Sequence, residues 1–431
     1  MRLNTESPKF SPDDGQFLPR LRDVRLLDHR ISWVNSIFLT ITHLLAALVF
    51  IPLYFSPTGF WKFMLAYFIV HVWLGLVSTT AYAHRMVSHR ATQKISPLVH
   101  LFFGYIGQTL AVQGSIAEWA GRHRAHHAVD GHRKHAQDPY SAVWFEHKWQ
   151  NFMWSHCLCY CFHHPSTNTD YEQRIKGVLN QYNFVSMQHR WYLFFLIVVN
   201  YALPFIIGLW AGGTPWTGLC FVWTAVTATV VIQQITWTVN SFTHLFGIRA
   251  ARSSARNNYF WLLPLGEGNH HADHHDAPTD YRNGFGWSGW VSDPTRYILI
   301  VLRWLRLIGP LQRTSRALEL RALAERKIKT LKAKFQNRQS HERWVECEAR
   351  LEDFKTQLVN KAKACDRLLR ERVRLFEQKA KLSRTQWKQQ WMMLKSEIAK
   401  ARLDVEYAQS IFKLEVEAVQ HALQNTFESK A

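Results

Sequence analysis

Cysteine is scarce in this sequence, and its spacing fits no common metal or disulfide pattern. The 431 residues include six cysteines, at positions 157, 159, 161, 220, 347 and 365, and none of them forms a Cys-x-x-Cys pair. This spacing excludes a zinc ribbon, a four-cysteine iron–sulfur site and a disulfide framework. We therefore expect the chain to work in a reducing compartment.

Charged residues are missing from four long stretches of the first 240 residues. Residues 33–55, 191–211 and 216–239 contain none, and residues 60–83 contain only Lys62. At a rise of about 1.5 Å per residue, each stretch is long enough to cross a hydrocarbon core of about 30 Å. The alternative is four buried helices of a large soluble core, which the length of the stretches and their terminal Trp and Tyr residues disfavour. We expect four transmembrane helices in two hairpins.

Basic residues outnumber acidic ones, and the excess lies outside these stretches. Lys and Arg total 52 against 32 Asp and Glu, for a net charge of +20. Nucleic acid, an anionic membrane and an acidic partner are the ordinary explanations for such a charge. With four membrane helices we expect the membrane and an acidic protein, and no nucleic acid. Arginines flank the hairpins on one side only, so the positive-inside rule places both termini and the central loop in the cytosol.

The two ends of the chain differ from the apolar middle. Residues 1–30 are polar and lack the short apolar stretch of a signal peptide, so we expect no cleaved leader. The polar ends show no evident retention signal, which favours a bacterial inner membrane over the endoplasmic reticulum. We divide the chain into a cytosolic N-terminal segment (1–30), a membrane domain (31–310) and a charged C-terminal extension (311–431).

Glycine and proline are both absent from the C-terminal extension. It has 27 Lys and Arg against 16 Asp and Glu, and apolar residues recur at steps of three and four between Leu351 and Leu382. Some positions where the repeat would place an apolar residue are instead basic, namely Lys361, Arg372 and Lys379. The heptad pattern is therefore imperfect. We expect a long cytosolic helix or helical hairpin that self-associates as a coiled coil. A single solvated, charge-rich helix is the alternative.

Histidine is concentrated in three blocks: HRMVSH at 84–89, HRAHH at 123–127 and GEGNHHADHH at 266–275. The first block ends the second predicted span, the second block lies in the central loop, and the third follows the fourth span. An even number of membrane crossings separates the three blocks. All of them therefore share the cytosolic face, where they can meet.

Spacing selects nine imidazoles from these blocks and their surroundings. The pattern His-x-x-His-His in the second and third blocks places three imidazoles on one face of a helix. His84 and His89 are five residues apart, about 140° around a regular helix, so we expect them to serve two neighbouring ions and not one. His244 follows the fourth span, four residues after Asn240. Nine ligands fit two ions better than one: His84, His89, His123, His126, His127, His244, His271, His274 and His275.

One choice within the third block rests on spacing alone. His270 is adjacent to His271 but about 100° away around a helix. Only His271 keeps the three-and-four spacing with His274 and His275, so we favour His271 as the ligand.

These blocks resemble the histidine boxes of the membrane fatty-acid desaturases, most closely those of the acyl-CoA desaturase (stearoyl-CoA desaturase-like) branch. The matching segments are HRMVSH, EWAGRHRAHH, WTVNSFTHLFG and GEGNHHADHH, within about residues 20–310. The resemblance implies an all-α integral membrane protein of four transmembrane helices, with a cytosolic helical cap that holds a non-haem di-iron centre. Such a centre uses dioxygen and two electrons to introduce a cis double bond into a long acyl chain.

Carried over position by position, the resemblance implies that the nine histidines ligate two iron ions and that Asn240 acts through a bound water. It implies no catalytic residue beyond these ligands. Trp237 matches a tryptophan that lines the substrate site. At Gly121 and Arg122 the chain departs from the Arg-Asp pair that helps the animal enzymes to hold coenzyme A. The acyl carrier is therefore open among coenzyme A, acyl-carrier protein and membrane lipid.

The sequence contains no recognisable electron-carrying domain. HHPS at 163–166 differs from the haem-binding HPGG of a fused cytochrome, so we expect a separate ferredoxin, rubredoxin or b-type cytochrome as donor. Three alternatives to a desaturase stay open. A histidine-box hydroxylase of alkanes, sterols or carotenoids would use a similar site. A zinc-dependent membrane hydrolase would need one ion and a glutamate base, and a membrane-anchored coiled-coil scaffold would only store metal.

Overall fold

The computed structural model describes residues 31–130, 138, 140, 142, 145–162, 169–250, 253–258, 269–335, 341–379 and 382–428. The predicted N-terminal segment 1–30 and residues 266–268 of the third histidine block lie outside the described residues. The chain separates into two compact units, Met1–Arg313 and Thr314–Ala431. In the part of the chain that is described, both units are built from helices. A short antiparallel pairing of β1 (Ile248–Arg249) with β2 (Arg256–Asn257) is added in the first unit.

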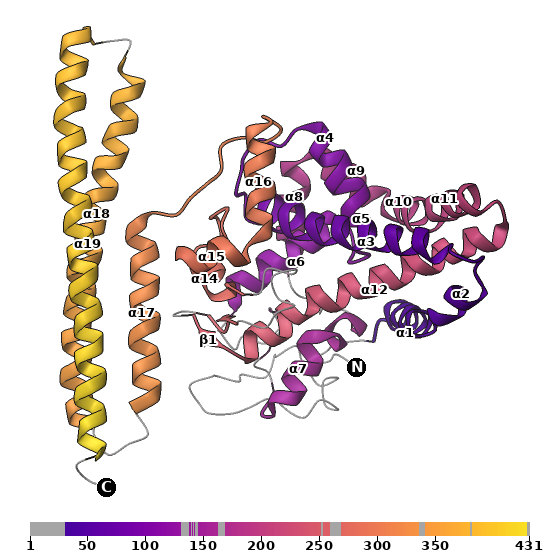
Figure 1. Ribbon diagram of the computed structural model, residues 1–431, viewed down its shortest axis with the longest axis horizontal. Coiled ribbons are helices and arrows are strands. Elements are labelled where there is room, and N and C mark those ends of the chain that lie inside the picture. The colour runs from indigo at the N-terminus through magenta and orange to yellow at the C-terminus, as the bar shows by residue number, and fades with distance from the viewer. Residues whose placement is uncertain are drawn as a thin grey trace, which may run out of the picture. The chain divides into compact units, whose positions relative to one another are not determined.

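Among the described residues of the first unit, three helical segments are long and apolar enough to cross a membrane (Figure 1). They are α3 (Trp61–Val77) with η3 (Ser78–Ser88), α10 (Tyr192–Ile197) with η6 (Val198–Ala202) and α11 (Leu203–Gly212), and α12 (Pro215–Leu245). Gly213, with a φ of 73°, reverses the chain between α11 and α12. Gly208 lets these two helices pack closely, because a Cβ there would lie 2.4 Å from the carbonyl oxygen of Thr217.

The prediction of a fourth span over residues 33–55 is not confirmed. This stretch forms α1 (Trp33–Ala47), with 15 residues, and a separate short helix, α2 (Phe50–Phe55). A 15-residue helix rises roughly 22 Å, which is less than a hydrocarbon core of about 30 Å. Pro52 explains the break, because its ring removes one amide donor and crowds the carbonyl of Leu48, four residues earlier.

The first unit also contains shorter helices. One of them is a π-helix, η4 (His100–Gly107), and one is a 3₁₀-helix, η5 (Leu158–Cys161). The others are the α-helices α4 (Pro97–Val99), α5 (Gln108–Leu110), α6 (Ile116–Val129), α7 (Lys148–His156), α8 (Thr169–Gln181), α9 (Asn183–Arg190), α14 (His271–Asp276), α15 (Gly286–Ser292) and α16 (Pro294–Trp304). The side chain of Ser115 accepts from the amide of Glu118, and the Glu118 carboxylate accepts from the amide of Ser115. This capping box fixes where α6, the helix of the second histidine block, begins.

The second unit is a bundle of three helices: α17 (Arg316–Phe335), α18 (His341–Glu377) and α19 (Arg384–Glu428). Its core includes Leu320, Leu351, Leu358, Val405 and Phe412, which come from all three helices. The apolar positions that predict a coiled coil are thus covered by helices of the same chain, so a single solvated helix is wrong as a description of this extension. Self-association stays a prediction.

Candidate metal centre

Five histidines, from the end of η3, from α6 and from α14, converge. Their ligand atoms lie within 4.8 Å of one another, and they are His84, His89, His123, His127 and His274. His84 Nε2 is 2.9 Å from His274 Nε2, and His274 Nε2 is 3.1 Å from His127 Nε2. His89 and His123 approach each other through their Nε2 atoms at 2.8 Å. Three distant histidine blocks therefore meet at one point. We call these five histidines the first group.

Four more histidines form a second group: His126, His244, His271 and His275. His244 Nε2 lies 2.9 Å from His271 Nε2. The two groups are neighbours, because the ring of His127 stacks on that of His275 with centroids 4.0 Å apart. The structure thus places all nine predicted imidazoles in two adjacent groups, as a pair of ions would need.

The first group corrects the expectation that His84 and His89 serve different ions. Both belong to the same group, and their ring centroids are 5.0 Å apart. The expectation assumed a regular α-helix, whereas η3 is a π-helix, in which each amide bonds to the carbonyl five residues earlier. The amide of His89 accordingly donates to the carbonyl of His84 at 3.1 Å. This wider turn brings residues five apart onto one face.

Side-chain hydroxyls support the wide turn where it begins. Thr79 Oγ1 donates to the carbonyl of Gly75 at 3.0 Å, and Thr80 Oγ1 donates to that of Leu76 at 2.9 Å. Such bonds to the carbonyl four residues earlier give a partner to oxygens that a change of helix type leaves without an amide.

Two buried carboxylates hold the outer nitrogens of the second group. Asp138 Oδ1 lies 3.0 Å from His126 Nδ1, and Asp130 Oδ2 lies 3.0 Å from His275 Nδ1. A carboxylate on Nδ1 fixes the tautomer and the orientation of the ring, and it makes Nε2 a better metal ligand. The rings of His126 and His275 are therefore turned so that Nε2 faces the group.

His244 reaches one of the same carboxylates through a hydroxyl. Its Nδ1 donates to Ser254 Oγ at 2.7 Å, and Ser254 in turn donates to Asp130 Oδ1. Asp130 therefore supports two of the four imidazoles in the second group.

The polar atoms of these groups fit metal ions better than they fit one another. The Nε2 atoms of His126 and His275 are buried and have no hydrogen-bond partner among the described residues. Elsewhere in the groups, pairs of Nε2 atoms face each other at 2.8–3.1 Å. Buried polar atoms normally have partners, and neutral imidazole is a good ligand for iron, zinc and other transition metals.

Burial keeps most of these imidazoles neutral. Desolvation, followed by repulsion between neighbouring imidazoles, lowers the pKa well below the ordinary value of 6.5 in His89, His123, His127, His271 and His274. In His275, burial lowers the pKa to about 4 against the opposing effect of Asp130. In His126, burial is outweighed by the carboxylates of Asp138 and Asp130, which raise the pKa to about 8. Neutral rings offer the lone pair that a metal requires.

Three further residues considered in the sequence analysis each contact a side chain outside the two groups. His270 belongs to neither group, and its Nδ1 lies 3.2 Å from Asp273 Oδ2. Asn240 donates through Nδ2 to the hydroxyl of Tyr160 at 3.1 Å. Trp237 stacks on Tyr160, with centroids 4.8 Å apart. Action of Asn240 through a water and contact of Trp237 with substrate stay predictions.

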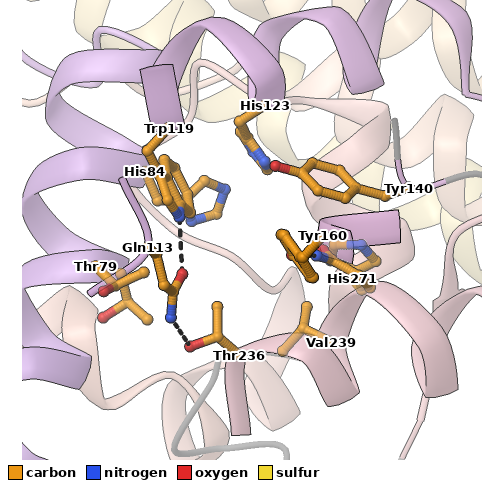
Figure 2. Close-up of a pocket in the computed structure, with 12 residues that line it drawn as sticks. Thr79, His84, Gln113, Trp119, His123, Tyr140, Tyr160, Thr236, Val239 and His271 are labelled. Atoms are coloured by element: carbon orange, nitrogen blue, oxygen red, sulfur yellow. Dashed lines mark hydrogen bonds between the residues drawn. The ribbon is translucent and has the colours of Figure 1, made fainter. Parts of the chain in front are cut away.

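A cavity lies beside the two groups (Figure 2). Its wall includes His84 and His123 from the first group and His271 from the second. The other lining residues are Thr79, Thr80, Gln113, Trp119, Tyr140, Tyr160, Thr236, Val239 and Asn240. Gln113 ties the wall together, accepting from Trp119 Nε1 at 3.0 Å and donating to Thr236 Oγ1 at 3.1 Å. A ligand in this cavity would touch both groups of imidazoles at once.

The carboxylates of Asp130 and Asp138 are not among the residues predicted from the sequence, although the sequence contains a signal for them. Residues 84–140 contain only three acidic residues, Glu118, Asp130 and Asp138. One of them caps α6, and the other two hold ring nitrogens of the second group. Such rarity of carboxylates beside two histidine blocks could have marked Asp130 and Asp138 as partners of the imidazoles.

Relatives with named activities are similar to this chain over about two thirds of its length. No protein-family profile matches the chain. The sn-1 stearoyl-lipid 9-desaturase of Synechocystis sp. is 30% identical over 64% of this chain and 78% of its own length. The enzyme of the same name from Anabaena variabilis is 31% identical over 64% of this chain and 93% of its own. Acyl-CoA desaturase 1 of Saccharomyces cerevisiae is 28% identical over 70% of this chain and 56% of its own. The chain belongs to the membrane fatty-acid desaturase family.

Proposed function

We propose that this chain is an oxygen-dependent fatty-acyl desaturase that introduces a cis double bond into a long acyl chain. The observation that carries the proposal is the cavity whose wall contains imidazoles of both histidine groups. A methylene pair held there would lie beside both candidate metal positions. The relatives act on stearoyl-lipid or acyl-CoA substrates by name, so the substrate here is an acyl-CoA or a similar acyl carrier.

Two iron ions fit the two groups of imidazoles. His84, His89, His123, His127 and His274 would hold one ion, and His126, His244, His271 and His275 the other. When bound, the iron pair supplies the oxidation by dioxygen that removes two hydrogens from the acyl chain. The orphaned Nε2 atoms of His126 and His275 and the neutral state of most rings support this assignment.

The protein's own side chains position the substrate and the rings. Asp130 and Asp138 hold imidazoles in one orientation, so little reorganisation is needed when metal binds. Trp119, Tyr160 and the Gln113 bridge give the cavity a fixed wall. Holding an unreactive methylene in one place is the main contribution a protein can make to such a reaction.

The electrons come from a separate protein in this proposal: a ferredoxin, a rubredoxin or a b-type cytochrome. The basic surface of the chain suits an acidic donor of this kind. In this proposal α1 and α2 cross the membrane together as one broken span, so that both termini face the cytosol. The protein lies in a bacterial inner membrane, and the C-terminal bundle brings copies of the chain together.

Fatty-acid profiling of a heterologous host tests the reaction. Cells that express the chain should contain new monounsaturated acyl chains, with the double bond located by mass spectrometry. The double variant His123→Ala, His127→Ala removes two ligands of the first group and should give no new product. His147→Ala is the matched control, because His147 is exposed and lies in neither group.

Two results would contradict the proposal. One is an unchanged profile from membrane-inserted protein that contains two irons and has been supplied with reduced donor proteins. The other is a product that contains an added oxygen atom, which would identify a hydroxylase.

A further inference from the structure

Helix α16 presents an apolar face to its surroundings. Tyr297, Val301 and Trp304 are 44%, 50% and 78% exposed and lie at i, i+4 and i+7, on one side of the helix. The opposite side is buried and includes Thr295, Leu299 and Leu302, of which the two leucines belong to the core of the first unit. An ordinary surface helix turns its apolar side inward. An outward apolar stripe therefore indicates something apolar that covers it.

Exposed basic residues lie near the C-terminal end of this stripe. Residues 294–313 contain four arginines, of which Arg296 is buried, and no acidic residue. Arg303 and Arg306 are exposed beside Trp304, and the exposed Lys94 belongs to the neighbouring segment. The amide of Gly309 donates to the carbonyl of Lys94 at 2.7 Å, which holds that segment against the chain just after α16.

At the C-terminal end of α16, Arg306 has an unusual backbone conformation. The amide of Leu307 donates to the carbonyl of Leu302 at 2.9 Å, closing the helix, and Arg306 takes the left-handed conformation with a φ of 59°. Glycine is the usual residue at such a position, because any side chain there is strained. Strain kept at an exposed residue points to a use for its side chain.

The position of α16 relative to the spans is defined within the first unit. In Figure 1 the helix runs across the direction of α3 and α12. Its start is bound to η3, because Thr295 Oγ1 lies 2.9 Å from Thr80 Oγ1 and the Arg85 guanidinium pairs with Asp293 at 2.5 Å. It therefore lies crosswise at the end of a membrane span.

We propose that α16 lies in the membrane–water interface and binds anionic phospholipid. Tyr297, Val301 and Trp304 enter the upper acyl region, while Arg303 and Arg306 contact lipid phosphates. An apolar stripe with aromatic residues and flanking arginines is the composition that favours this location. The attraction of each arginine for an anionic leaflet adds to the binding. The inference rests on the membrane placement of the chain and not on the proposed reaction.

Native mass spectrometry of the full-length protein tests the proposal. Protein in a neutral detergent is titrated with phosphatidylglycerol or with phosphatidylcholine of the same chain length. We expect tighter binding of phosphatidylglycerol, and a loss of about 25-fold in its affinity in Arg303→Gln, Arg306→Gln, or roughly fivefold per arginine. Lys388→Gln, Lys395→Gln is the matched control, since it removes the same charge from exposed positions of α19.

If a variant unfolds, the affinities of the wild-type protein for the two lipids still decide the test. Equal affinity of the wild type for the two lipids would overturn the proposal, as would full phosphatidylglycerol binding by the folded arginine variant. The same spectra give the number of chains per particle. If Trp304→Ser converts a dimer to a monomer without changing lipid binding, a second copy of the chain covers α16 and the proposal is wrong.

Discussion

Asp130→Asn should release metal from the second histidine group and leave the first group intact. Asp130 contacts His275 directly at 3.0 Å and reaches His244 through Ser254. An asparagine keeps the size of the side chain but loses the charge that favours a proton on each outer ring nitrogen. Two of the four imidazoles in the second group then lose their fixed orientation.

The size of the effect follows from this double role. Loss of one outer partner weakens metal binding by about 10- to 100-fold. Because Asp130 serves two ligands, we expect the upper value, about 100-fold or about 2.7 kcal/mol. Asp138→Asn, which affects one imidazole of the group, that of His126, should cost about 10-fold. Glu118→Gln is a control, since Glu118 only caps α6.

The assay is iron per chain, measured in purified protein over a series of buffered free-iron concentrations. The half-saturation point of one equivalent should rise about 100-fold in Asp130→Asn, while that of the other equivalent stays unchanged. If both equivalents weaken together, or if neither moves by more than about threefold, the division into two groups with different carboxylate support is refuted.

Two further changes test the fold. Arg85→Met removes the charged side chain that pairs with the carboxylate of Asp293. Both side chains are 1% exposed, so the change should destabilise the first unit by about 3–5 kcal/mol in thermal unfolding. The double variant Arg85→Met, Asp293→Asn should recover part of this loss, and no recovery would contradict the ion-pair explanation. Leu358→Ala, at a 1% exposed position, should destabilise the C-terminal bundle by about 2–5 kcal/mol, as measured by limited proteolysis in denaturant. Leu403→Ala, 65% exposed, should change its stability by less than about 0.5 kcal/mol, and an equal effect of the two would contradict the bundle.

The meeting of the histidine blocks could be predicted, because it depends on the number of membrane crossings between them. Charge-free stretches show where the chain crosses the bilayer, and an even number of crossings puts separated blocks on one face. The His-x-x-His-His spacing of the second and third blocks then needs only a helix to align three rings. These arguments do not depend on any detail of packing.

Other features depend on interactions that the local pattern does not contain. The length of α1 is limited by Pro52, and the hydropathy of an apolar run does not reveal this effect. The coiled-coil pattern of the extension has the same appearance whether its partner is a second chain or, as here, α17 and α19. Ser254 and Asp130 are 124 positions apart, so their contact could not be inferred from spacing.

The π-helical turn at η3 changes how histidine patterns should be compared between sequences. In an α-helix, two ligands share a face when three residues separate them; in η3, His84 and His89 share a face with four residues between them. Insertion of one residue can thus be absorbed by a change of helix type without loss of the chelating pair. An alignment that penalises this gap would separate chains whose sites are geometrically equivalent. During evolution, insertion of one residue between these two histidines can therefore change the helix type and leave the metal-binding arrangement unchanged.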